Sequence, residues 1–152
     1  MRIRAARPDE AAFISDLAVR SKAYWGYDDD FLAGSRIQLA VRPDEVARRR
    51  VTVAERDGVV VGFYALEGDP PVGVLDLMFV DPDHLRAGVG RQLFAHVVAT
   101  ARAAGLTAFT IDSDPFAEDF YLTMGAIRTG ETPSPVRAGR KLPRLTFAVA
   151  SG

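Results

Sequence analysis

The stretch VDPDHLRAGVGRQL, residues 80–93, joins an apolar run to a helical pattern and places Gly88 and Gly90 at the junction. Glycine weakens a helix by up to about 1 kcal/mol, so two glycines at a helix start need a reason. The first N–H groups of a helix are unpaired and lie at the positive end of its dipole, where they can bind an anion. Because glycine has no Cβ atom, Gly88 and Gly90 would let a phosphate approach this backbone. Arg86 and Arg91 would add positive charge at the rim. A tight turn without a ligand is the alternative that the glycines alone leave open.

Two familiar phosphate motifs do not fit this stretch. A Walker A loop continues as Gly-Lys-Ser/Thr, whereas here Gly90 is followed by Arg91 and Gln92. A dinucleotide-binding fingerprint needs a third glycine where this sequence has Leu93. The loop therefore indicates a different kind of phosphate ligand, if it binds one.

The rest of the chain predicts an alternation of strands and helices. Periodicity, turn residues and capping residues indicate strands at 2–6, 72–80, 106–111, 126–131 and 144–150, a hairpin over 50–68 that turns at Asp57–Gly58, and helices at 8–21, 29–40, 88–104 and 116–124. The segment 129–143, rich in proline and glycine, is predicted to be a long loop before the last strand.

Composition limits the class of protein. With 152 residues, 48% of them hydrophobic, the chain has the size of one domain, and we expect residues 1–152 to form one. A formal net charge of -1 provides no general field for nucleic acid or an anionic membrane. Without cysteine and with two histidines, the chain offers no disulfides and no metal site is predicted. No apolar signal core or membrane-length apolar stretch occurs, so we expect a cytoplasmic protein.

The glycine stretch and its surroundings resemble a known family. LDLMFVDPDHLRAGVGRQLFAHVVATAR resembles motif A of the GNAT superfamily of acyl-CoA-dependent N-acetyltransferases: a strand ending Val-x-Pro, here Val80 to Pro82, and then a loop with Gly-x-Gly that opens a long helix. Leu85 departs from the pattern, because the family often has Gln or Arg there. Downstream, DPFAEDFYLTMGAIRTGE resembles motif B. The resemblance implies an α+β fold with a mixed, mostly antiparallel twisted sheet of six or seven strands, flanked by helices, with a splayed central strand pair.

The resemblance also implies a cofactor and its contacts. Acetyl-CoA would be the donor and coenzyme A the product. The backbone of Phe79 and Val80 would contact the pantetheine arm and the thioester, and one N–H there would polarise the thioester carbonyl. The pyrophosphate would lie on the loop formed by Leu85, Arg86, Ala87, Gly88, Val89, Gly90 and Arg91.

Two residues are candidates for proton transfer. By resemblance, Tyr121 would donate a proton to the departing thiolate; the alternative is an ordinary core aromatic residue. Asp76 lies inside an apolar strand, and strict alternation puts it on the same face as Met78 and Val80. Asp76 could be the base that deprotonates the amine, a ligand for its positive charge, or a solvated strand-end residue. Glu131 is a weaker second choice for the base.

The acceptor pocket is predicted between two irregular segments, YWGYDDD at 24–30 and PSPVRAGRKLP at 133–143. Trp25 and Tyr27 offer aromatic walls, and the carboxylates from Asp28 to Asp30 suit an amine. Arg137 and Arg140 would instead suit a carboxylate or phosphate on the acceptor. Together these charges allow a zwitterionic small molecule, and a protein N-terminus or lysine stays open.

The leading hypothesis is therefore transfer of an acetyl group from acetyl-CoA to a primary amine of a small acceptor, by direct attack in a ternary complex. One alternative is an acyl-CoA-binding sensor or inactive interaction module with the same fold. Another is an unrelated α+β interaction protein whose helix start binds some other phosphate. We expect no nucleic-acid or membrane partner, and leave open whether two copies form a homodimer through the C-terminal strand.

Overall fold

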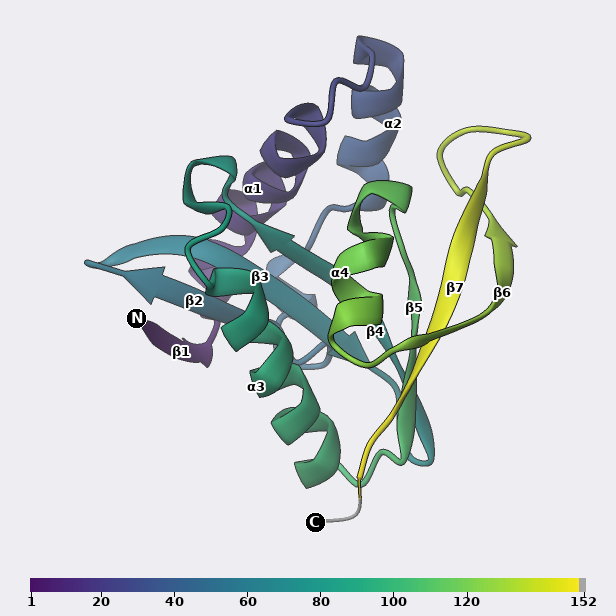
Figure 1. Cartoon of the computed structure of the whole chain (residues 1–152). Coiled ribbons are helices and arrows are strands. Elements are labelled where there is room, and N and C mark those ends of the chain that lie inside the picture. Colours follow the sequence, from purple (N-terminus) through teal and green to yellow (C-terminus); the bar gives the residue numbers. More distant parts are fainter. Residues whose placement is uncertain (151–152) are drawn as a thin grey trace.

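The computed structural model describes residues 1–150, which form a seven-stranded sheet and four helices (Figure 1). The strands are β1 (Arg2–Ala5), β2 (Thr52–Arg56), β3 (Val59–Glu67), β4 (Val72–Val80), β5 (Ala108–Asp112), β6 (Ile127–Pro133) and β7 (Lys141–Ala148). The helices are α1 (Ala11–Ala23), α2 (Asp29–Gln38), α3 (Val89–Ala103) and α4 (Glu118–Thr123). Among these residues, no helix has both the length and the apolar character needed to cross a bilayer.

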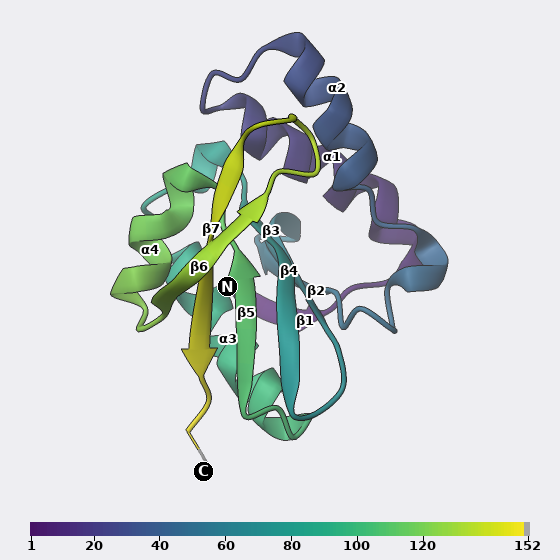
Figure 2. The same ribbon diagram turned by 90° about the vertical axis from the view of Figure 1, so that its right-hand side faces the viewer.

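The sheet has the order β1-β2-β3-β4-β5-β7-β6, and β4–β5 is its one parallel pair. These two strands pair only from Val72 to Val74 and from Ala108 to Thr110. Figure 2 shows them side by side near the ends where they begin. Both strands continue beyond the paired positions, so the centre of the sheet is open. This arrangement confirms the predicted mixed, mostly antiparallel fold with a splayed strand pair.

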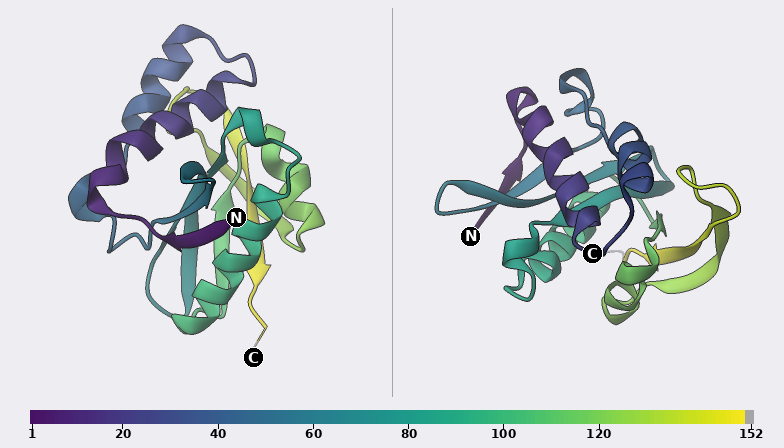
Figure 3. Two further views of the ribbon diagram at one scale, coloured as in Figure 1. Left: turned by 90° about the vertical axis from the view of Figure 1, so that its left-hand side faces the viewer. Right: turned by 90° about the horizontal axis from the view of Figure 1, so that it is seen from above.

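Helices cover both faces of the sheet (Figure 3). On one face, α1 buries Ile14 and Leu17 against a core that includes Phe63 and Leu77. On the other face, α3 buries the predicted stripe, whose members are Val89, Leu93, Val97 and Ala101, against a second core. Spacing of three to four residues puts such a stripe on one side of a helix, which explains why the sequence identified it.

The turn and loop predictions had different outcomes. Asp57 and Gly58 both have positive φ, at 53° and 79°, as a type I′ hairpin turn requires. The predicted loop over 129–143 is shorter in the structure, because β6 and β7 pair as far as Pro133 and Lys141. The remaining loop, residues 134–140, extends toward α2 (Figure 2) and is called the β6–β7 loop below.

Candidate active site

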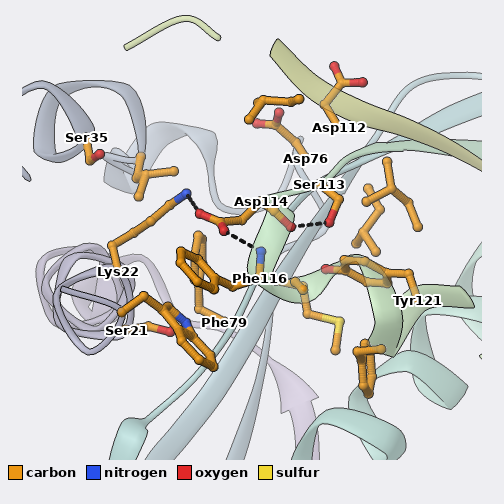
Figure 4. Close-up of a pocket in the computed structure, with 18 of the residues that line it drawn as sticks. Ser21, Lys22, Ser35, Asp76, Phe79, Asp112, Ser113, Asp114, Phe116 and Tyr121 are labelled. Carbon is orange, nitrogen blue, oxygen red and sulfur yellow. Dashed lines mark hydrogen bonds and ion pairs between the residues drawn. The ribbon is translucent and has the colours of Figure 1, made fainter. Parts of the chain in front are cut away.

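One cleft of about 650 Å³ begins at the opening between β4 and β5. The glycine loop and the start of α3 form one end of it. Its other walls come from α1, α2, the segment around α4, and the β6–β7 loop. Figure 4 shows the side chains that meet in its middle. A helix start suited to an anion and a set of polar side chains therefore open into the same space.

The glycine loop presents unpaired backbone donors. Within residues 1–150, no acceptor is present for the N–H groups of Arg86, Gly88, Val89, Gly90 and Arg91. Gly88 caps α3 with a left-handed φ of 82°, and a Cβ built on it would meet nothing within 4 Å. Arg86 also has positive φ, at 66°. The loop thus leaves five backbone donors without a protein partner at one end of the cleft, as an oxyanion site requires.

Asp81 holds this loop in place. Its carboxylate accepts a hydrogen bond from the Asp83 N–H at 2.9 Å and pairs with Arg20 of α1 at 3.2 Å. Burial opposes ionisation, but these two contacts outweigh it, so the pKa of Asp81 lies below its usual range. The loop is therefore tied to α1 by a charged group that stays ionised at neutral pH.

Phe79 and Val80 lie at the end of β4, where they line the cleft. On one side they pair with Phe63 and Gly62 of β3. On the other side, within residues 1–150, β4 has no strand partner beyond Val74. The backbone predicted to contact the pantetheine arm is thus next to an open strand edge.

Tyr121 of α4 is 6% exposed, and its side chain points into the cleft (Figure 4). Its hydroxyl has no hydrogen-bond partner among residues 1–150. Burial, and then the negative charge of Asp114, raise the pKa of Tyr121 well above its usual value. The hydroxyl is therefore a protonated, uncommitted donor at neutral pH.

A polar network that the sequence reasoning missed crosses the cleft beside Tyr121. Lys22 of α1 donates to Asp114 at 2.6 Å, and the Tyr27 hydroxyl donates to the same carboxylate oxygen at 2.9 Å. Burial opposes ionisation of Asp114, but Lys22 and the hydrogen bonds from Phe116 and Tyr27 keep the pKa of Asp114 below its usual range. Burial and the charge of Asp114 raise the pKa of Tyr27 to about 12. The sequence signal at Asp114 is the Asp-Pro pair at 114–115, which is typical of a residue that caps the start of a helix.

The predicted acceptor residues divide into two groups. Trp25 and Arg140 line the cleft, and the Trp25 ring stacks on Phe116 at 5.0 Å between centroids. Tyr27 and Asp28 lie outside the lining. The Tyr27 hydroxyl donates to Asp114, which is in the lining. Asp28 caps α2 and pairs with Arg137 at 2.8 Å. Two of the charges from which a zwitterionic acceptor was inferred, on Asp28 and Arg137, thus neutralise each other, whereas Arg140 remains in the cleft lining.

Asp76 lines the cleft, but not on the predicted face. Ala65 and Leu66 of β3 pair with Leu77 and Leu75, so Asp76 is the extra residue of a β-bulge. The bulge breaks the alternation: Leu75 and Met78 belong to the core under α3, while Leu77 belongs to the core under α1. The carboxylate instead meets Arg49 at 2.7 Å. Glu131, the second candidate, is outside the cleft lining and pairs with Arg128 at 3.1 Å.

Comparisons with known proteins agree on one family. Residues 38–139 match the family model described as an acetyltransferase (GNAT) domain. The chain is 29% identical over 134 residues, covering 86% of its length and 89% of the relative, to a 5-NmdU N-acetyltransferase of Pseudomonas phage PaMx11. A GCN5-related N-acetyltransferase structure from Rhodopseudomonas palustris has the same fold, with a TM-score of 0.81 at 23% identity over 97% of this chain and 94% of that one. A PaiA N-acetyltransferase from Thermoplasma acidophilum, in complex with coenzyme A, has a TM-score of 0.79 at 13% identity over 97% and 98% of the two chains.

Proposed function

The chain belongs to the GNAT family of acetyltransferases, and we propose that it transfers the acetyl group of acetyl-CoA to a primary amine of a small acceptor within a ternary complex. One observation carries the proposal: the unpaired N–H groups of the glycine loop and the free hydroxyl of Tyr121 open into one cleft. A cleft that is continuous from the loop to the β6–β7 loop has room for donor and acceptor together, which supports direct transfer.

The residues of the cleft fit acetyl-CoA. The unpaired donors between Arg86 and Arg91 would hold the pyrophosphate, since they lack protein partners and the space beside Gly88 is open. The open edge of β4 near Phe79 and Val80 would bind the pantetheine arm as an added strand. When bound, acetyl-CoA supplies an activated thioester.

Tyr121 would supply the proton that the departing thiolate takes up. The amine lone pair forms a C–N bond to the carbonyl carbon, the C–S bond breaks, and the sulfur takes a proton from the Tyr121 hydroxyl, which regains one through water from the nitrogen as the amide forms. Such general acid help contributes about 10² to 10⁴ in rate. The acceptor ammonium must first lose a proton, directly or through water, and Asp76 is the candidate in the lining that would bind or deprotonate it.

The size of the acceptor is limited by the β6–β7 loop. Arg137 of this loop pairs with Asp28 at the start of α2, and Val136 lies against Gly34 in the middle of that helix. The loop therefore closes the acceptor end of the cleft, which favours a small molecule over a folded protein. The name of the phage relative, 5-NmdU N-acetyltransferase, agrees with transfer to nitrogen.

A calorimetric titration with acetyl-CoA tests the donor site. We expect the parent protein to bind and Gly88→Glu to lose binding, because the new side chain and its negative charge would occupy the loop. Gly58→Glu is the matched control, since Gly58 has nearly the same φ, 79° against 82°, and also has nothing within 4 Å of its Cβ position. Equal binding by both variants would reject the assigned loop. Binding by the parent without acetyl transfer to any amine would instead indicate an acyl-CoA sensor.

A further inference from the structure

The polar network beside Tyr121 carries one positive charge more than it carries negative charge. The Asp114 carboxylate oxygen lies 2.6 Å from the Lys22 ammonium and 3.9 Å from a guanidinium nitrogen of Arg140. Two cations against one carboxylate leave a charge of +1. The three side chains are only 13%, 13% and 19% exposed, so solvent screens this charge weakly.

Arg140 is the cation of this network that has unpaired hydrogen-bond donors. One guanidinium nitrogen donates to the Tyr27 hydroxyl at 2.6 Å, and within residues 1–150 the other guanidinium N–H groups have no acceptor. Its guanidinium lies over the rings of Tyr27 and Phe31, at 5.0 and 4.8 Å from their centroids. Its backbone is fixed as well, because the Ser134 N–H donates to the Arg140 carbonyl at 2.7 Å. A planar, oriented guanidinium with free donors in a cleft wall is suited to an oxyanion.

A second group of charged residues at the cleft carries the opposite charge. Asp76 belongs to a cluster in which Arg49 lies within 4 Å of Glu45, Glu67 and Asp76, and Arg48 contacts Glu45 and Glu67. Three carboxylates against two arginines leave a charge of -1. Of the five side chains, only Asp76 lines the cleft.

We propose that the acceptor is an amine that also carries an oxyanion, a carboxylate or a phosphate, which binds Arg140 while the ammonium lies toward Asp76. This inference rests on the proposed function, because it concerns the acceptor half of the same cleft. The same cleft lining includes the apolar side chains of Phe31 and Leu39 of α2 and the Ser35 hydroxyl, which is buried without a partner among residues 1–150. A lining that holds a positive and a negative group beside apolar side chains suits an acceptor with two opposite charges on a short carbon chain.

Two pairs of amines test the inference and separate its two oxyanion forms. Butylamine is compared with 4-aminobutyrate, and ethanolamine with 2-aminoethyl phosphate. Release of the coenzyme A thiol gives kcat/KM for each amine, and the chain adds no thiol of its own because it contains no cysteine. We expect the anionic member of at least one pair to be preferred about tenfold or more.

The variants assign that preference to Arg140. Arg140→Gln should reduce the ratio of kcat/KM between anionic and neutral partners about tenfold or more, and Arg140→Lys should retain part of it. Lys141→Gln is the matched control: it removes a positive charge from the neighbouring residue, whose side chain is 70% exposed and outside the lining, and should change the ratio less than about twofold. Unchanged acetyl-CoA binding verifies that the variants are folded.

The outcomes separate this inference from the proposed function. Acetylation of neutral amines as fast as anionic ones, unaffected by Arg140→Gln, would retain the activity and overturn the inference. If no amine is acetylated, binding of the two anionic amines to the coenzyme A-saturated protein is measured by calorimetry. Binding that Arg140→Gln abolishes would support the inference and reject the activity, and no binding at millimolar concentration would overturn the inference.

Discussion

Replacing Lys22 with Met should destabilise the protein far more than an ordinary ion-pair mutation. Met has a similar length but no charge, so the variant leaves the Asp114 carboxylate in the wall of the cleft without its 2.6 Å partner. Both side chains are 13% exposed. Removing one partner of a buried pair costs about 3–5 kcal/mol, because the remaining charge is left uncompensated.

The lower end of this range applies here. The Tyr27 hydroxyl and the Phe116 N–H still donate to Asp114, and the Arg140 guanidinium is only 3.9 Å away. We therefore expect a loss of about 3 kcal/mol in the free energy of unfolding. For a protein of this size, that corresponds to a decrease in Tm of roughly 6–12 °C.

Urea denaturation of Lys22→Met and Arg36→Met measures the effect of burial directly. The Arg36–Asp16 pair has nearly the same length, 2.7 Å, but its side chains are 61% and 63% exposed. We expect Arg36→Met to cost less than about 1 kcal/mol. Adding Asp114→Asn to Lys22→Met should restore part of the lost stability, because it removes the unpaired charge.

Similar losses for the two single variants would refute the reasoning, since distance alone would then set the strength of both pairs. A loss below about 1 kcal/mol for Lys22→Met would show that water or Arg140 fully replaces the lysine.

Three further predictions concern the acid, the N-terminal ion pair and the β6–β7 loop. Tyr121→Phe should lower kcat about 10²-fold or more while the Kd for acetyl-CoA stays within about twofold; an unchanged kcat would remove the hydroxyl from the reaction. The pKa of Glu10 is lowered from 4.5 to about 2, mainly by hydrogen bonds that the Arg4 side chain donates to its carboxylate. A carboxyl group whose pKa is lower in the folded than in the unfolded chain stabilises the fold when it is ionised, and this stabilisation is lost as pH falls toward the folded-state pKa. The urea midpoint should therefore decrease between pH 4.5 and 2 in the parent, and decrease less in Glu10→Gln. Gly34→Ala would place a Cβ 2.9 Å from the Val136 side chain, so tryptic cleavage of the loop that carries Val136 should accelerate; an unchanged rate with a raised Tm would show that the loop is not packed there.

The sequence predicted the elements whose signals are local. The stripe on α3 and the turn at Asp57–Gly58 depend on residues a few positions apart, and both are present in the structure. The extension of β6 to Pro133 was missed, because this strand is exposed along most of its length and has no apolar alternation. Its pairing with β7 defines it, and no pattern within the segment itself reveals that pairing.

The site residues also divide into those that local patterns identify and those that depend on contacts between distant segments. Gly88 and Tyr121 could be identified because they belong to motifs, and both lie at the cleft. Asp28 pairs with Arg137 across 109 positions, and Lys22 pairs with Asp114 across 92, so no spacing in the sequence reveals either contact. Asp76 does not lie on its predicted face, because a bulge in β4 breaks the alternation there. The bulge depends on the register with β3, which the sequence of β4 alone does not give.

Two sets of backbone groups at the cleft have no partner within residues 1–150. Parallel pairing between β4 and β5 stops at Val74 and Thr110, although both strands continue, and the first turn of α3 keeps its N–H groups free. Both sets of groups border the same cleft, so one ligand can supply the partners that the protein does not. A ligand with an extended arm and a phosphate group would pair both sets of groups at once, and binding only to the folded state would stabilise the protein by about 2.7 kcal/mol at a concentration of 100 times Kd. We therefore expect a long, phosphorylated donor to bind along the open edge of β4.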